Sequence, residues 1–180
     1  MTNREFFLFC WQDEYPVFLK TFEAVPPEKF QFRPSPESRS TADLVWVQVV
    51  EKKCWFELLK SGQITWKMGP PELSLEEMIA AYQEAHAELA RRLQLVDDES
   101  WLHKPTQFVA DGKVFFETSM GHMFWLGLFD AIHHRGQLTV HLRAMGAKVP
   151  AVYGPSGDDP IDLHHAFYWP AREGFLAAAG

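Results

Sequence analysis

Cysteine is scarce in this chain, and long hydrophobic runs are missing. Cys10 and Cys54 are the only cysteines among 180 residues, and each stands between aromatic residues without a CxxC spacing. We therefore expect two buried, reduced thiols rather than a disulfide or a nucleophile. No run of the roughly 18 apolar residues that span a bilayer is present, and Glu5, Asp13 and Glu14 interrupt any secretory leader. The sequence predicts a cytoplasmic protein without membrane contacts.

Positive charge is also in short supply. Lys and Arg number 17 against 24 Asp and Glu, a formal net charge of −7, and no basic run offers phosphates an electrostatic footprint. We therefore expect no nucleic-acid partner. The chain is rich in apolar residues, with 47% hydrophobic and 14% aromatic residues. At this length that composition is enough to bury one core, so we expect a single domain over residues 1–180.

Four segments carry the 3.6-residue periodicity of amphipathic helices. They are residues 3–24, 41–60, 75–95 and 119–145. One stripe of the first segment is continuously aromatic and holds Phe7, Trp11, Tyr15, Phe18 and Phe22. Four long helices predict an all-α protein, a four-helix bundle whose functional sites lie between facing helices.

The ends of these segments carry start and stop signals. Ser40 is suited to cap the second helix, and Ser74 with Glu77 forms a capping box for the third. Gly146 stands where a left-handed residue would end the last helix.

Two regions fall outside the four helices. Residues 106–117, TQFVADGKVFFE, alternate apolar and polar side chains about an Asp-Gly pair, so a short two-stranded hairpin and a plain loop fit equally well. The tail is expected to be irregular, with one short helix at 160–168 and aromatic side chains that pin it to the body. We expect His164 and His165 on the surface rather than over a site.

The stretch DAIHHRGQL in the last helix holds the residues most suited to chemistry. Asp130 and His134 are four apart, so their side chains project from one helix face and could share a divalent cation. Two ligands are too few for a catalytic metal, which needs about three protein groups. The alternative is a satisfied polar group, with Asp130 paired to His134 or Arg135.

Two longer stretches resemble a known family. HHRGQLTVHLRAMG, residues 133–146, with VPAVYGPSGDDP after it, resembles the C-terminal part of the DinB-like superfamily, and FRPSPESRSTADLVW, residues 32–46, resembles the entry to its second helix. The resemblance implies an up-down-down-up four-helix bundle, homodimers, and a divalent metal on three histidines. One of those histidines comes from the second helix and two, four residues apart, come from the fourth.

The chain departs from that pattern at two of the three histidine positions. His134 matches the last ligand, but Asp130 and Val47 occupy the other two. Asp can replace a histidine ligand, whereas Val donates nothing. The missing donor would be Glu51, one turn beyond Val47, or His86 from the third helix. Each has a plainer interpretation, Glu51 as a buried or partly solvated carboxylate and His86 as a core histidine.

Two functions are therefore compatible with the sequence. The resemblance implies a metal-dependent thiol transferase, isomerase or hydrolase that uses Zn, Ni, Fe or Mn and a low-molecular-weight thiol, with Asp130 and His134 on the metal. The loss of two histidines favours instead a metal-free module that binds a small molecule or forms homodimers. In that case Asp130, His134 and Glu51 are the polar groups of an aromatic pocket.

Overall fold

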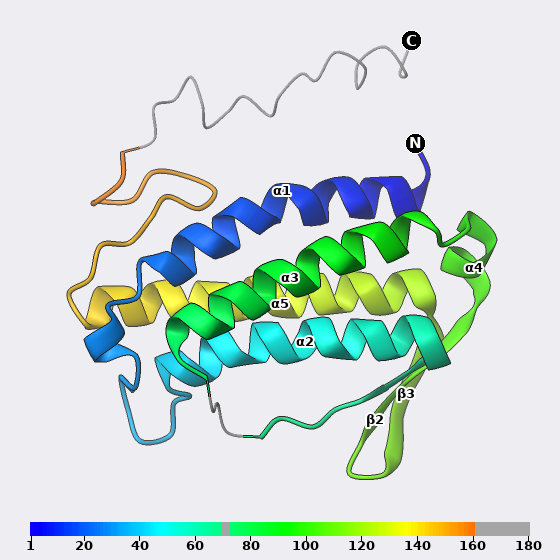
Figure 1. The fold of residues 1–180 in the computed structure, drawn as a ribbon, viewed down its shortest axis with the longest axis horizontal. Helices are drawn as coiled ribbons and strands as arrows, with labels where there is room; N and C mark the ends of the chain where they lie inside the picture. Colours follow the sequence, from blue (N-terminus) through cyan, green and yellow to red (C-terminus); the bar gives the residue numbers. More distant parts are fainter. Residues whose placement is uncertain (70–72, 161–180) are drawn as a thin grey trace.

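Four long helices lie side by side in the computed structural model, which describes residues 1–69 and 73–160 (Figure 1). They are α1 (Asn3–Glu23), α2 (Thr41–Ser61), α3 (Leu75–Gln94) and α5 (Met120–Ala144). In Figure 1, α1 and α5 run from right to left, whereas α2 and α3 run from left to right. All four segments predicted from periodicity are therefore helices. Within the described ranges, no helix has both the length and the apolar character needed to cross a bilayer.

Side-chain caps start the first three of these helices. In each capping box a hydroxyl at the N-cap accepts a hydrogen bond from the backbone N–H three residues on. The acidic side chain of that third residue accepts a hydrogen bond from the N-cap backbone N–H. The pairs are Thr2 with Glu5, Ser40 with Asp43, and Ser74 with Glu77. Gly146 follows α5 with φ +73°, as the stop signal predicted.

The fold is mostly helical, as predicted, but the all-α description has to be extended by a small three-stranded sheet. Its strands are β1 (Gln63–Thr65), β2 (Pro105–Ala110) and β3 (Lys113–Ser119), in the order β1-β2-β3. The β2–β3 hairpin confirms one of the two structures expected for residues 106–117, and its turn uses Asp111 and Gly112 at positive φ. Strand β1 was not predicted, because it is too short to show a period and pairs parallel with β2, from which the chain separates it by α3 and a second, short helix.

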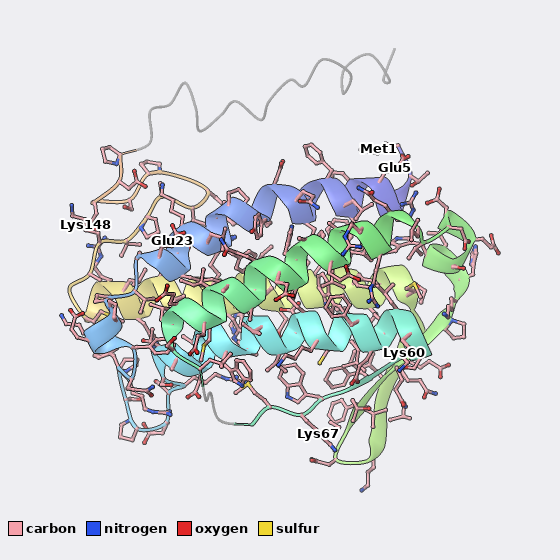
Figure 2. The ribbon with its side chains drawn as sticks, in the orientation of Figure 1. Met1, Glu5, Glu23, Lys60, Lys67 and Lys148 are labelled. Carbon is pink, nitrogen blue, oxygen red and sulfur yellow. The ribbon has the colours of Figure 1, made fainter. Side chains whose placement is uncertain are left out.

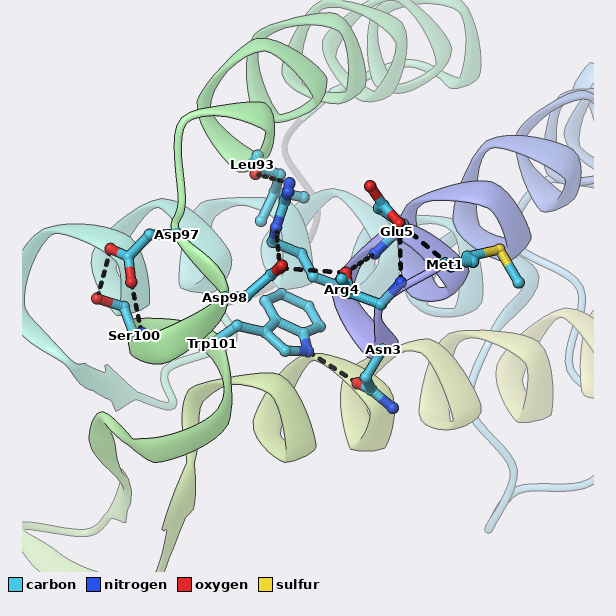
Figure 3. Close-up of polar contacts among 10 residues, drawn as sticks. Met1, Asn3, Arg4, Glu5, Leu93, Asp97, Asp98, Ser100 and Trp101 are labelled. Atoms are coloured by element: carbon cyan, nitrogen blue, oxygen red, sulfur yellow. Dashed lines mark hydrogen bonds and ion pairs between the residues drawn. The ribbon is translucent and has the colours of Figure 1, made fainter. Parts of the chain in front are cut away.

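A short helix, α4 (Asp98–His103), was also missed, and it anchors the start of α1 (Figure 3). The buried Trp101 side chain donates from Nε1 to Asn3 Oδ1 over 2.8 Å. Arg4 Nε forms an ion pair with Asp98 Oδ1 over 2.8 Å. These contacts tie the connection after α3 to the N-terminus, next to the hairpin.

The aromatic stripe of α1 faces the core, as predicted, although Tyr15 stays partly exposed. Side chains fill the space between the helices, and charged residues such as Glu23 and Lys148 lie at the ends of the molecule (Figure 2). Cys54 is buried, Cys10 is half-buried, and both are free thiols.

The segment after α5 folds back over α1 (Figure 1). The buried Arg135 guanidinium donates to Glu14 and, over 2.7 Å, to the hydroxyl of Tyr153, which itself donates to Glu14 over 2.6 Å. The predictions for the tail, including the 160–168 helix and His164 and His165, fall on residues 161–180 and so lie outside the described residues.

Candidate functional site

Helix α5 brings Asp130 and His134 together one turn apart. Asp130 Oδ2 lies 3.4 Å from His134 Nε2, and the Asp130 side chain is 57% exposed while that of His134 is 11% exposed. The hydrogen bond between the two groups lowers the pKa of Asp130 and raises the pKa of His134. The pair is therefore an ionised carboxylate at the surface with a largely buried imidazole behind it.

Gln137 fixes the orientation of this imidazole. Its Oε1 lies 2.9 Å from His134 Nδ1. Because an amide oxygen only accepts, Nδ1 carries the proton and Nε2 is turned toward Asp130. An N–H held by an amide oxygen is also the usual support of a metal-ligating histidine, but here Nε2 would first have to release the proton that Asp130 accepts.

Asp130 also borders a cavity between α2, α5 and the small sheet. The cavity encloses about 350 Å³. Its wall carries four aromatic side chains, Trp55, Trp66, Phe108 and Phe116, with apolar groups from Cys54, Ile64, Met123 and Leu126. The Phe108 and Phe116 rings stack at 5.3 Å across β2 and β3, and Trp66 stacks on Phe108 at 6.4 Å. The sheet thus supplies the aromatic side of the cavity.

Glu51 is the second carboxyl group on the cavity wall. Its side chain is 6% exposed, and among the described residues no hydrogen bond reaches Oε1. Burial raises the pKa of Glu51 to about 8, against the opposing attraction of Lys52. Gly127 lines the cavity beside it, and a Cβ there would lie 3.1 Å from Glu51 Oε1. A buried, unpaired carboxyl oxygen on a cavity wall is the least satisfied polar group of this region.

Glu51 and Asp130 together give the cavity two carboxyl groups in opposite states. The raised pKa of Glu51 favours a proton on its carboxyl group near neutral pH, whereas the lowered pKa of Asp130 keeps that group ionised. Such a difference between neighbouring carboxyl groups is what general acid and base catalysis needs.

The predicted metal ligands do not come together as a complete set. Val47 is buried and apolar, as the sequence implied. His86 does not line the cavity: its ring stacks between Trp11 at 3.9 Å and Tyr15 at 4.0 Å, with Nε2 3.1 Å from Gln12. Across residues 1–69 and 73–160, no three His, Cys, Asp or Glu side chains lie close enough to share an ion. The donors as placed therefore do not fit a metal held by three protein ligands.

Lys52 is the interior residue that the sequence reasoning missed. Its ammonium lies 5.0 Å from the Trp11 ring centre, 4.7 Å from Trp55 and 4.9 Å from Tyr82, and the residue is 2% exposed. The three rings form an aromatic cage that compensates part of its lost hydration. Burial lowers the pKa of Lys52 to about 8. Thirteen of the 21 residues of α2 are buried, so some of its polar residues, including Lys52, lie inside the protein.

Solved structures share the fold of this chain at low sequence identity. A DinB-like protein from Bacillus cereus aligns with a TM-score of 0.66 and 19% identity over 83% of this chain and 97% of its own. One from Bacillus subtilis gives 0.63 and 17% over 85% and 98%. A mutant of the mycothiol-dependent maleylpyruvate isomerase gives 0.52 and 11% over 83% of this chain and 65% of its own. No curated protein sequence matches at a significant level.

The sequence itself matches one family over nearly all of the described residues. The sequence model of the DinB family covers residues 1–162, from the start of α1 to the segment that folds back over it. This match confirms the resemblance found in the HHRGQ stretch and in the entry to the second helix. The chain belongs to the DinB family.

Proposed function

We propose that this DinB family member binds a small, flat organic molecule in the cavity between α2, α5 and the sheet. The volume of about 350 Å³ falls within the usual range for small-molecule sites, roughly 300–1,000 Å³. Aromatic rings on one side and a few polar groups on the other are typical of such sites. A wider groove of about 650 Å³ between α2 and α3 carries none of the candidate residues.

One observation carries this proposal. Glu51 Oε1 is buried and has no hydrogen-bond partner among the residues that the structure describes, yet it lies on the wall of a cavity and not within closed packing. A buried acceptor without a partner costs about 1–3 kcal/mol, more when it is charged. A ligand that supplies the missing hydrogen bond removes that cost.

Two adjacent phenylalanines give a matched test. Phe116 lines the cavity, whereas Phe115 is 77% exposed and does not. Benzyl alcohol, titrated calorimetrically, is expected to bind the unchanged protein and Phe115→Ala alike and to bind Phe116→Ala several-fold more weakly. Equal affinity for all three proteins, or no binding at millimolar concentration, would refute the cavity as the site.

A metal-dependent thiol transferase, isomerase or hydrolase is the second candidate, with the four long helices as the up-down-down-up bundle of a homodimer. The observation that favours it is the Gln137–His134–Asp130 arrangement, which turns Nε2 toward a carboxylate. The fold likeness to a mycothiol-dependent isomerase supports a low-molecular-weight thiol as its co-substrate. The third ligand would be Glu51, after a rearrangement of α2 side chains.

Elemental analysis separates the two candidates. Stoichiometric Zn, Ni, Fe or Mn that is lost in Asp130→Ala and His134→Ala, and kept in the exposed control His133→Ala, would support the metalloenzyme. Protein that takes up none of these metals after incubation, with an unchanged melting temperature, would leave the cavity proposal standing alone.

A further inference from the structure

The polar groups on the cavity wall are all of one kind. Glu51 and Asp130 supply carboxyl oxygens, and the other lining residues described are aromatic, aliphatic, sulfur-containing or glycine. The wall therefore presents hydrogen-bond acceptors and aromatic ring faces to a ligand. None of the described lining residues is Lys, Arg or His.

The cations that lie near these carboxyl groups are engaged elsewhere. The ammonium of Lys52 is enclosed by Trp11, Trp55 and Tyr82. His134 is held between Asp130 and Gln137, behind the cavity wall. Arg39, whose charge lowers the pKa of Asp130, is an exposed residue with its guanidinium 3.4 Å from Met68 Sδ. None of the three lines the cavity, so none is placed to pair with an anionic group inside it.

The Glu51 carboxyl group has an unsatisfied hydrogen-bond acceptor that a ligand could fill. It is buried, its Oε1 has no partner within the described chain, and it faces the same space as four aromatic rings. A ligand N–H would replace the hydration that burial removed.

We propose that the cavity selects a small aromatic amine, whose ring packs against Trp66, Phe108 and Phe116 and whose amino group donates to Glu51. The proposal rests on the proposed ligand cavity and adds the chemical class of its occupant. An ammonium group gains from both neighbours once Glu51 releases its proton to the solvent, because the resulting carboxylate attracts the ammonium and the faces of aromatic rings attract cations. An anionic group on the same ring would lose its hydration beside two carboxyl groups.

Three ligands of nearly one shape test this selectivity. Benzylamine, benzyl alcohol and benzoate differ mainly in the charge and hydrogen-bonding capacity of the group beside the ring. In calorimetric titrations near neutral pH we expect benzylamine to bind about tenfold more tightly than benzyl alcohol, as a charge-assisted hydrogen bond implies. Benzoate should bind more weakly than either.

Glu51→Gln identifies the group responsible. The variant keeps the side-chain shape but cannot ionise beside an ammonium group, so the advantage of benzylamine over benzyl alcohol should fall to about twofold or less. The matched control is Glu57→Gln, an exposed carboxylate on the same helix that does not line the cavity, and it should retain the full preference. Melting temperatures of both variants establish that they fold.

The two proposals fail in different ways. If benzyl alcohol binds as expected but benzylamine has no advantage, or if Glu51→Gln keeps that advantage, the amine selectivity is wrong and the cavity proposal survives. If benzoate binds as tightly as benzylamine, the selectivity is again wrong. If none of the three ligands binds, the proposed ligand cavity itself is overturned.

Discussion

Gly127 lets α5 approach α2 more closely than a residue with a side chain could. A Cβ at this position would lie 2.7 Å from Trp55 Nε1 and 3.1 Å from Glu51 Oε1, whereas one at Gly136 would meet nothing within 4 Å. We expect Gly127→Ala to cost about 1–3 kcal/mol of unfolding free energy through overpacking. Gly136→Ala in the same helix should be neutral or stabilising by up to about 1 kcal/mol.

Urea denaturation of the two glycine variants measures this difference. Ligand titration adds a second readout, because the new methyl group at residue 127 enters the wall shared by Trp55 and Glu51. If Gly127→Ala were as stable as Gly136→Ala, the close approach of the two helices would be wrong.

His86 makes stability depend on pH in the acidic range. Burial, with a smaller contribution from Lys52, lowers the pKa of His86 to about 3, while Trp11 and Tyr15 stack on its ring and Gln12 bonds its Nε2. The unfolded chain takes up a proton at a pKa near 6.5, so the stability present above that pH is lost as pH falls toward 3. By about pH 4 the loss should be roughly 3 kcal/mol.

The substitution His86→Gln checks this dependence. The variant should lose less stability than the unchanged protein between pH 6.5 and pH 4, as measured by urea denaturation at each pH. The exposed His133→Gln serves as control and should follow the unchanged protein. Parallel pH profiles for His86→Gln and the unchanged protein would contradict the assignment.

The two residues predicted to share a metal show how far local sequence reasoning reached. The spacing of Asp130 and His134 predicted that they share a helix face, and the structure places them 3.4 Å apart. Whether they bind a metal stays a prediction. The aromatic wall could not be anticipated, because Phe108 and Phe116 reach the cavity only through strand pairing and through packing of the sheet on α2 and α5. Such tertiary contacts produce no periodic pattern in the sequence.

At the scale of elements, the Arg135 network joins α5, α1 and the segment after α5. Arg135 is 1% exposed, lies 4.6 Å from the Phe18 ring centre, and bonds both Glu14 and Tyr153. Arg135→Met should cost about 3 kcal/mol or more, because Glu14 would remain largely buried without its cation. Thermal or urea unfolding measures the loss, and a cost below about 1 kcal/mol would mean that the pair contributes little.

Tyr153→Phe removes only the link to the last segment. We expect a cost of about 1 kcal/mol for the lost hydrogen bonds. Hydrogen exchange should become faster in residues 149–160 and stay unchanged in α1 and α5. Asp158 and Asp159 still hold the backbone N–H groups of Val149 and Ala151 in this variant. Unchanged exchange over the whole segment would show that those two carboxylates suffice.

The elements themselves were predictable where they are long or carry local signals. The capping box of Ser74 and Glu77, the aromatic stripe of α1 and Gly146 after α5 are properties of neighbouring residues, so the sequence displays them. Strand β1 has three residues and is held by long-range bonds, including Trp66 N–H to the Val109 carbonyl at 2.9 Å. Helix α4 has only six residues, and tertiary contacts of Trp101 stabilise it. Neither has enough residues for a periodic pattern.

For the molecule as a whole, the core divides into two clusters that lie along the same helices. The first includes Trp55, Leu58, Trp101 and Phe124, and the second includes Phe22, Val45, Tyr82 and Leu138. Because α2 and α5 contribute to both clusters, loosening one also loosens the helices that support the other. We therefore expect a single cooperative unfolding transition.

Two core truncations test this coupling. Leu58→Ala in the first cluster and Leu138→Ala in the second should each cost about 3 kcal/mol, and their effects should add. Trp11, Trp55 and Trp101, three of the seven tryptophans, belong to the first cluster, so fluorescence is weighted toward that region while far-UV circular dichroism follows all helices. The two signals should coincide in urea for both variants. A fluorescence transition displaced from the circular dichroism transition in Leu138→Ala would show that the clusters unfold separately.

The aromatic cage around Lys52 also gives the protein an internal optical reporter. An indole has a larger dipole moment in its excited state than in its ground state, so a charge held close by displaces its emission wavelength. The ammonium lies within 5.0 Å of two indole rings. Burial lowers the pKa of Lys52 and raises the pKa of Glu51, both to about 8, so the emission maximum should change as these neighbouring groups lose their protons. A ligand that changes the charge of the neighbouring Glu51 carboxyl group would then shift the tryptophan emission maximum, without any added dye.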